Sequence, residues 1–293
     1  MSEPVKRVLV TRGSPLALRQ TELTRLYLAR CFPEIEWEIL TVRTTGDAQT
    51  QWSLEQKGGK GLFTKELEEA LLDGRADIAV HSAKDMPTEG PGGLALAGFL
   101  PREDPHDVLV WREDCPVPTF IATSSPRRRA QAKRLFPNAV WSEIRGNVDT
   151  RLKKVAQGQA DATILAAAGL KRLGIRQWPG LQFKPFHLRC MVPAAGQGAV
   201  ALQTRADDVA WLQPALDADT AHAVIIERLF LSALGDGCHT AFAAFFSKGR
   251  LYLFDERLGR REFSFKATEP EAIKAAVEKI IEQLNSEPTG EPS

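Results

Sequence analysis

Strand-like and helix-like segments alternate along most of this 293-residue sequence, and the alternation limits the fold more than any other feature. The first cycle runs from a strand predicted at residues 8–11 to a helix predicted at 15–29, with Ser14 as N-cap and Pro15 at the first helical position. Residues 76–81 form an almost unbroken apolar run, as expected for a buried parallel strand. The pattern predicts a parallel sheet with helices on both faces.

The alternation restarts after residue 100, with further helices predicted at residues 125–136 and 148–157 and a buried strand at 160–166. Beyond about residue 217 the pattern changes to a helix, three alternating strands and a final amphipathic helix, which predicts a small α+β domain. The polar tail, residues 285–293, is expected to be disordered.

Composition excludes several classes of protein. The net charge of +1 argues against a nucleic-acid-binding protein, which usually carries a basic excess. We find neither a secretory signal nor an apolar run long enough to span a membrane. The four cysteines form no CxxC pair, so we expect no metal site and a reducing, cytoplasmic location.

Polar and charged residues follow the predicted strands of the first half. Arg12 and Ser14 come directly after the first strand, and Lys84-Asp85 follow the apolar run at 76–81. Ligands of open α/β sheets bind beyond the carboxyl ends of the strands, so these side chains mark a candidate site with Asp85 as its acid–base group. A surface ion pair between Lys84 and Asp85 is the alternative interpretation.

Three consecutive arginines open the helix predicted at residues 125–136. Ser125 is its expected N-cap, and Arg127, Arg128 and Arg129 fill the first turn. Cations there oppose the helix macrodipole, at about 0.3–1 kcal/mol each when exposed. The arrangement is explained if guanidinium groups and backbone N–H groups both point at an anion. A solvated basic turn is the alternative.

Basic residues recur at two further strand-to-helix turns of the second half. Arg145 and Arg151 lie on either side of one helix start, and Arg172 follows the buried strand at 160–166. Because these positions are topologically equivalent, the sequence predicts one basic cleft. A glycine-rich loop containing Lys60 is either a lid or a structural turn. Cys238, on another glycine-rich turn, is either a covalent attachment point or an inert thiol.

Taken together, these segments resemble the porphobilinogen deaminase (hydroxymethylbilane synthase) family over nearly the whole chain. The matching stretches are residues 60–68, 76–82 with Lys84-Asp85, 123–125 with Arg127-Arg128, 145–148 with 150–152, 168–174 and 196–199. The resemblance implies two periplasmic-binding-protein-like α/β lobes, at 1–100 with 197–216 and at 101–196, plus a C-terminal cofactor-attachment domain at 217–293.

The resemblance also implies a chemistry. A dipyrromethane cofactor would be joined by a thioether to Cys238, and Asp85 would be the catalytic aspartate. Four molecules of porphobilinogen would be condensed stepwise onto this primer with loss of ammonia, and the linear tetrapyrrole would be released by hydrolysis. Positions that match the family's carboxylate-binding residues are Arg12, Ser14, Lys84, Ser125, Arg127, Arg128, Arg145, Arg151 and Arg172. We add Lys60 as a candidate binding residue.

The expected partner is therefore a small molecule, with no nucleic acid, membrane or metal, and we expect a monomer of heme and tetrapyrrole biosynthesis. Always-charged, fork-shaped guanidinium groups suit a ligand that gains carboxylates with every condensation. The alternative is a diverged, non-catalytic paralogue that binds anions or pyrroles. A pure anion receptor would gain nothing from the buried carboxylate that we expect at Asp85.

Overall fold

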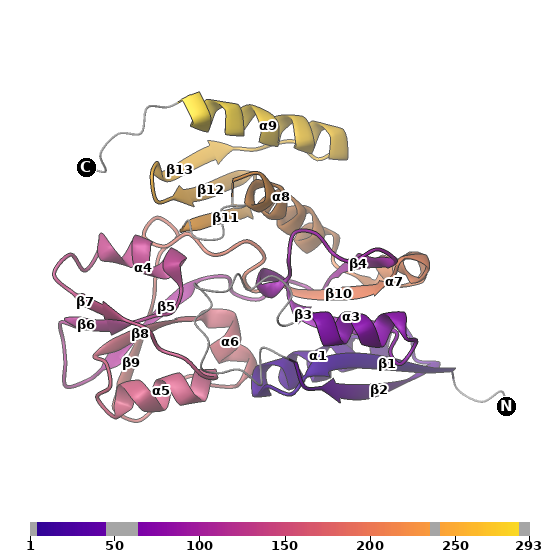
Figure 1. The fold of residues 1–293 in the computed structure, drawn as a ribbon, viewed down its shortest axis with the longest axis horizontal. Coiled ribbons are helices and arrows are strands. Elements are labelled where there is room, and N and C mark those ends of the chain that lie inside the picture. Colours follow the sequence, from indigo (N-terminus) through magenta and orange to yellow (C-terminus); the bar gives the residue numbers. More distant parts are fainter. Residues whose placement is uncertain (1–4, 45–63, 235–240, 287–293) are drawn as a thin grey trace. The chain divides into compact units, whose positions relative to one another are not determined.

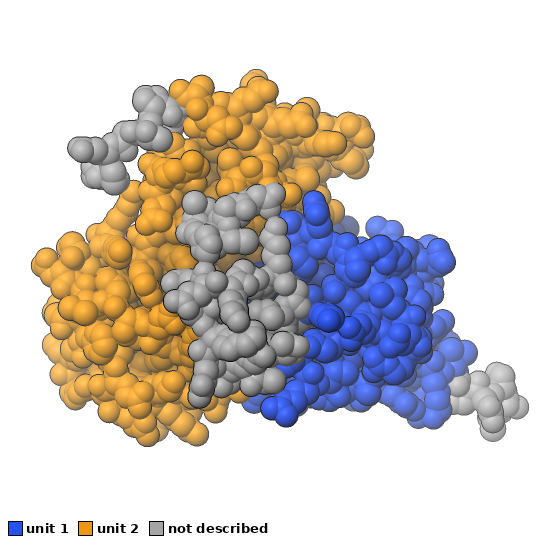
Figure 2. Space-filling view, viewed as in Figure 1, with its two compact units in different colours: residues 1–103, 199–221 blue, residues 104–198, 222–293 orange. Residues whose placement is uncertain are grey.

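Three β-sheets organise the described part of the chain (Figure 1). The computed structural model describes residues 5–44, 64–234 and 241–286. The chain divides into two compact units, residues 1–103 with 199–221 and residues 104–198 with 222–293, which Figure 2 colours separately. Within the described ranges, no helix is long and apolar enough to cross a membrane.

The first unit contains a five-stranded sheet with the order β2-β1-β3-β10-β4. Its strands are β1 (Val5–Arg12), β2 (Ile35–Val42), β3 (Ile78–Ser82), β4 (Leu94–Phe99) and β10 (Val200–Arg205). β1 runs parallel to both β2 and β3, whereas β10 is antiparallel to β3 and β4. The chain thus leaves this sheet after β4 and returns about a hundred residues later to fill its fourth position.

Helices cover both faces of this sheet. They are α1 (Pro15–Cys31), α3 (Lys65–Leu72) and the short α7 (Val209–Leu212). Leu9 of β1 packs with α1 and α7, whereas the next residue, Val10, packs with α3 on the opposite face. Ser14 caps α1 by accepting a hydrogen bond from the backbone N–H of Ala17 at 3.3 Å, so the predicted helix start is confirmed.

The second unit contains a five-stranded sheet with the order β7-β6-β8-β5-β9. Its strands are β5 (Asp107–Arg112), β6 (Phe120–Ala122), β7 (Val140–Ser142), β8 (Ala162–Ala166) and β9 (Leu181–Pro185). β6 is parallel to β7 and β8, and β5 is antiparallel to β8 and β9. Helix α4 (Pro126–Lys133) packs on one face, and α5 (Val148–Ala156) and α6 (Ala167–Arg172) pack on the other.

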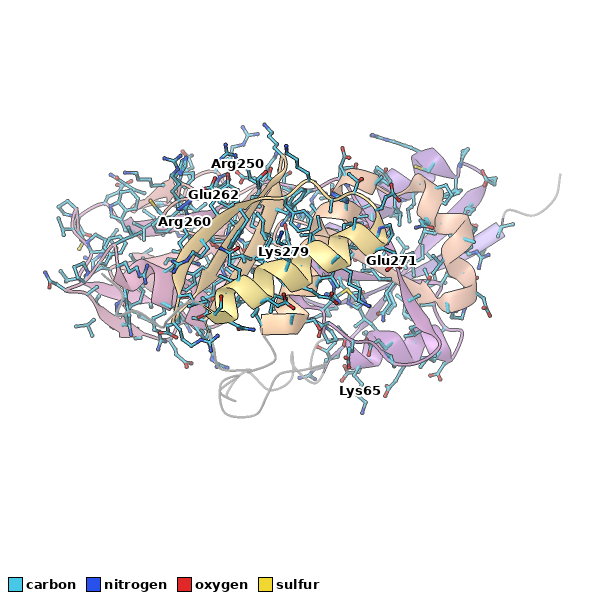
Figure 3. The ribbon with its side chains drawn as sticks, turned by 90° about the horizontal axis from the view of Figure 1, so that it is seen from above. Lys65, Arg250, Arg260, Glu262, Glu271 and Lys279 are labelled. Atoms are coloured by element: carbon cyan, nitrogen blue, oxygen red, sulfur yellow. The ribbon has the colours of Figure 1, made fainter. Side chains whose placement is uncertain are left out.

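A three-stranded antiparallel sheet completes the second unit. Its strands are β11 (Phe242–Ser247), β12 (Arg250–Asp255) and β13 (Gly259–Ser264), and its helices are α8 (Ala218–Leu234) and α9 (Pro270–Ser286). One face packs against both helices, and the other packs around Val192. On β12 and β13, Arg250 and Arg260 donate hydrogen bonds to Glu262 from either side, at 2.6 and 2.7 Å (Figure 3).

The fold class expected from the sequence is confirmed: two α/β lobes and a small α+β element at the C-terminal end. The expectation of purely parallel sheets was wrong, because both five-stranded sheets are mixed. Sequence alternation reports only consecutive strand–helix–strand units. It carries no information about β10, which enters the first sheet from a distant part of the chain, or about β5, which pairs in the antiparallel direction.

Candidate active site

In the first unit, two neighbouring parallel strands end at the same edge of the sheet. β1 ends at Arg12, and β3 ends at Ser82 and leads into a 3₁₀ turn, Ala83–Asp85. Because the carboxyl ends of parallel strands coincide, Arg12, Ser14 and Asp85 meet there, as the sequence predicted. Lys84 lies on the same turn and is exposed.

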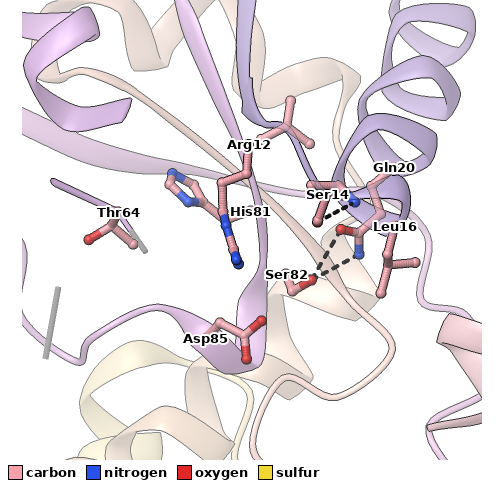
Figure 4. Close-up of a pocket in the computed structure, with 10 residues that line it drawn as sticks. Arg12, Ser14, Leu16, Gln20, Thr64, His81, Ser82 and Asp85 are labelled. Atoms are coloured by element: carbon pink, nitrogen blue, oxygen red, sulfur yellow. Dashed lines mark hydrogen bonds between the residues drawn. The ribbon is translucent and has the colours of Figure 1, made fainter. Parts of the chain in front are cut away.

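Arg12, Ser14 and Asp85 line a pocket of about 70 Å³, and all of its described lining residues belong to the first unit (Figure 4). The described lining residues are Arg12, Ser14, Leu16, Ala17, Gln20, Thr64, Val80, His81, Ser82 and Asp85. The side chains of Gln20 and Ser82 are joined by hydrogen bonds of 3.0 and 3.1 Å.

Arg12 and Asp85 direct opposite charges into this pocket (Figure 4). The Asp85 side chain is exposed, whereas we expected a buried carboxylate. The reason is local: the 3₁₀ turn carries Lys84 and Asp85 beyond the end of the buried strand β3. Asp85 can therefore meet a ligand that approaches from solvent, and the ligand itself would supply the surface that buries it.

Thr64 contributes a buried polar atom to the pocket wall. It is 2% exposed, and among the described residues its Oγ1 has no hydrogen-bond partner, although Thr64 occupies the N-cap position of α3. Buried hydroxyl groups are normally hydrogen-bonded, so this one is an exception.

His81 is the buried titratable group of this pocket. Its Nε2 lies 3.0 Å from the side-chain oxygen of Gln203 on β10. Burial lowers the pKa of His81 to about 4; the Gln203 hydrogen bond opposes this shift, and the charge of Arg12 adds to it. The imidazole is therefore neutral at neutral pH, and the cationic group of the pocket is Arg12.

Acidification from pH 6.5 to 4 is expected to destabilise the protein through His81. The unfolded chain binds a proton at this residue below about pH 6.5, whereas the folded ring does so only near pH 4. The contribution of His81 is thus intact above pH 6.5 and falls by about 3 kcal/mol as the pH drops to 4. Urea unfolding from pH 6.5 to 4 should show a larger loss of unfolding free energy for the wild type than for His81→Gln. Equal losses in the two proteins would contradict the prediction.

The second unit contains a buried ion cluster. Asp107, the first residue of β5, is completely buried, and Arg127 and Arg128 of α4 are 7% and 6% exposed. Arg127 donates to both Asp107 oxygens at 2.7 and 3.2 Å, and Arg128 donates to one at 2.9 Å. Burial alone would raise the pKa of Asp107, but the two guanidinium charges hold it well below its usual range.

The anion that Arg127 and Arg128 bind in the structure is an internal one. The sequence predicts guanidinium forks directed at a ligand, but both groups bind Asp107. Ser125 caps the helix by accepting a hydrogen bond from the backbone N–H of Arg128 at 3.4 Å. Among the described residues, the two guanidinium groups share this one carboxylate beside the helix N-terminus.

The ion cluster also holds both segments that connect the lobes. Gln197 donates from Nε2 to the backbone oxygen of Pro105 at 2.6 Å and to Asp107 at 3.1 Å. Arg172, at the end of α6, donates to the backbone oxygen of Gly198 at 2.6 Å. The chain segments around residues 105 and 197 are thus tied to the same buried carboxylate and to the edge of the second lobe.

Two further predicted residues lie at the carboxyl edge of this sheet, where the parallel strands β6, β7 and β8 end. Arg145 donates to Glu143 at 3.2 Å, and Arg151 donates to the backbone oxygen of Gly146 at 2.7 Å. Gly146 has φ +108°, and a Cβ atom there would lie 2.8 Å from the Thr150 side chain. Glycine is therefore required to keep Arg145 and Arg151 at this edge.

Lys60 and Cys238 lie outside the described residues. In the described ranges, no group of three or more histidine, cysteine, aspartate or glutamate side chains could hold a metal ion.

Sequence reasoning missed several residues of these clusters. A signal was available for Asp107, which begins an apolar strand twenty residues before three consecutive arginines. Gln20 gave another, because it is a polar residue on the buried face of α1. Nothing in the sequence links His81 with Gln203, since 122 residues separate them and only the return of β10 makes them neighbours.

A comparison with known families identifies the chain. The model described as "Porphobilinogen deaminase, dipyromethane cofactor binding domain" matches residues 8–213. The chain belongs to the porphobilinogen deaminase family.

Curated relatives agree with this assignment. A porphobilinogen deaminase from Ralstonia nicotianae is 45% identical over 83% of this chain and 74% of that protein. One from Paraburkholderia phymatum is 40% identical over 97% of this chain and 90% of its own length. Among solved structures, a periplasmic domain of Bordetella pertussis BvgS has a TM-score of 0.41 and 19% identity, covering 76% of this chain and 92% of that one; this likeness is too distant to carry an argument.

Proposed function

We propose that this chain is a hydroxymethylbilane synthase, a transferase that condenses four molecules of porphobilinogen with loss of ammonia and releases a linear tetrapyrrole. The observation that carries the proposal is the pocket in which Arg12, Ser14 and Asp85 meet, in a chain whose residues 8–213 match the porphobilinogen deaminase model. Nothing in the comparisons favours a non-catalytic paralogue.

The pocket has groups that fit a dipyrromethane cofactor and the substrate. Arg12 and Ser14 can bind an acidic arm. When bound, the dipyrromethane supplies the pyrrole carbon to which a new ring is added. In the second lobe, Ser125 and the backbone N–H groups at the start of α4 favour an anion beside Arg127 and Arg128.

The remaining basic side chains would hold the carboxylates of the growing product. Arg145 and Arg151 are held by local hydrogen bonds at the carboxyl edge of the second lobe, which limits the entropy they lose on binding. Arg172 is fixed to Gly198, and Lys84 lies exposed beside Asp85. We further propose that Lys60 and Cys238 contribute a carboxylate contact and the thioether attachment, respectively.

Asp85 would act on the reacting pyrrole. Breaking the carbon–nitrogen bond of the aminomethyl group releases ammonia and leaves a cationic methylene-pyrrole. The negative charge of the Asp85 carboxylate can stabilise this cation. It can then assist removal of the proton displaced when the new carbon–carbon bond forms. Its exposed place at the pocket mouth gives it access to each incoming substrate in turn.

We also propose a cytoplasmic monomer with no nucleic-acid partner. The net charge of +1 gives no general attraction to nucleic acid. Cys31, Cys115 and Cys190 are free thiols, as is usual in a reducing compartment.

Intact mass spectrometry of the purified protein tests the cofactor assignment. The mass should exceed the sequence mass by one dipyrromethane, and Cys238→Ser should remove the excess. Cys190→Ser is the matched control, since this exposed thiol should leave the added mass in place. An unmodified mass in folded, active protein would refute covalent attachment, and failure of the wild type to consume porphobilinogen would refute the enzymatic function itself.

A further inference from the structure

His81 has no part in the mechanism above, although it lines the same pocket as Asp85 and is 94% buried, its relative exposure being 6%. We propose that His81 is an additional ligand-binding residue, whose Nδ1 atom accepts a hydrogen bond from a pyrrole N–H group. This inference rests on the proposed function, because it names a contact that a pyrrole ligand would make in that pocket.

The hydrogen-bond chain behind the ring decides which nitrogen carries the proton. The carboxylate of Glu68 can only accept, so the Gln203 amide nitrogen, 3.4 Å away, must donate to it. The Gln203 oxygen then faces His81 and accepts from Nε2–H at 3.0 Å. Since the buried ring is neutral, its second nitrogen, Nδ1, has no proton and is a hydrogen-bond acceptor.

This acceptor is available to a ligand. In the part of the chain that the structure describes, the Nδ1 atom has no hydrogen-bond partner, and His81 lines the pocket. Buried polar atoms are normally hydrogen-bonded, so we expect a ligand in this pocket to donate a hydrogen bond to Nδ1.

The donor that fits is an N–H group. A ligand carboxylate is repelled by the Nδ1 lone pair and has Arg12 and Ser14 for partners in the same pocket. A pyrrole ring carries its N–H in the ring plane, apart from its acidic arms, so one ring can engage both kinds of partner. His81 would thus select pyrroles over other small polycarboxylates, which Arg12 alone cannot do. Both the dipyrromethane cofactor and porphobilinogen carry such pyrrole N–H groups.

Two substitutions separate the acceptor role from a structural one. In His81→Asn the amide lies where Nδ1 was, which keeps an acceptor for the ligand and loses the Gln203 contact. In His81→Gln the longer side chain reaches Gln203 and loses the Nδ1 acceptor. If Nδ1 binds substrate, His81→Gln should raise KM for porphobilinogen about tenfold with little change in kcat, and His81→Asn should be affected less. The reverse ranking would overturn the proposal.

A separate measurement shows whether the N–H group bound by Nδ1 belongs to the cofactor or to the substrate. If Nδ1 binds the cofactor, His81→Gln should lower the fraction of protein carrying the dipyrromethane mass, with KM unchanged in the loaded fraction. A change in neither quantity contradicts the proposal for both pyrroles. Wild-type activity measured in parallel keeps this outcome separate from failure of the proposed function.

Nitrogen-15 NMR of the wild-type protein gives a test that does not depend on the variants folding. The chain has five histidines, and the signal missing from His81→Asn or His81→Gln assigns the ring. We expect the neutral Nε2–H tautomer and an upfield shift of Nδ1 when the bound pyrrole is present. Comparison of cofactor-free protein, holoenzyme and holoenzyme with porphobilinogen identifies which pyrrole causes it. A protonated Nδ1, or no shift in any state, would exclude the contact.

Discussion

Changing Asp85 to asparagine should lower kcat for porphobilinogen by about 10²–10⁴-fold while the covalent cofactor is retained. Asparagine keeps the size of the side chain but lacks the charge that stabilises the cationic methylene-pyrrole. It also lacks a basic oxygen to receive the proton that is displaced when the carbon–carbon bond forms. Because Asp85 is exposed at the pocket mouth, its loss should hardly affect folding. Steady-state kinetics and intact mass measure the two quantities on one preparation.

Glu89→Gln is the matched control for this prediction. It removes one negative charge from an exposed position four residues further along the same connection, outside the described pocket lining. Its kcat should equal that of the wild type, so any general effect of charge in this segment is separated from the role of Asp85. Near-normal turnover by Asp85→Asn would rule out Asp85 as the acid–base group.

Asp107→Asn should destabilise the second unit by about 3–5 kcal/mol, the usual cost of leaving a buried charge without its partner. The substitution preserves shape but removes the carboxylate that both Arg127 and Arg128 bind. It also weakens the anchor of Gln197. Urea unfolding at pH 7 should show the loss as a lower midpoint.

The pH dependence gives the same prediction an independent check. The folded-state pKa of Asp107 lies below the unfolded value near 3.8, so its stabilising contribution is complete above that pH and is lost as the pH falls through the folded value. The wild type should therefore lose more stability below pH 3.8 than Asp107→Asn does. Asp114→Asn, which breaks an exposed ion pair with Arg112, should behave like the wild type. Equal stability of Asp107→Asn and wild type would show that the cluster is not a folding determinant.

Much of the fold was predictable because its signals are local. The capped start of α1 at Ser14 and the apolar run of β3 needed no long-range information. β4 was missed, since Gly98, with φ +153°, interrupts a short strand. β10 was not among the predicted strands either, because its partners β3 and β4 lie about a hundred residues earlier.

The candidate site was predictable to a similar degree. Residues beyond the ends of parallel strands, such as Arg12 and Asp85, can be assigned to one edge from topology alone. The direction in which a side chain points cannot be assigned from topology. Arg127 and Arg128 look from the sequence like ligand-binding groups, yet both point inward to a carboxylate twenty residues earlier. Whether a guanidinium group faces a ligand or an internal counterion depends on tertiary packing.

The position of β10 has a consequence for how the protein is made. When the first 199 residues have left the ribosome, β4 has no neighbour and β3 has an open edge, because β10 is the strand that joins them. The second lobe is then already complete in sequence, so the N-terminal lobe of the nascent chain is the later of the two to close its sheet. A translation pause before residue 205 would prolong the interval in which those edges can pair with a neighbouring chain, and chaperones would be needed most at that stage.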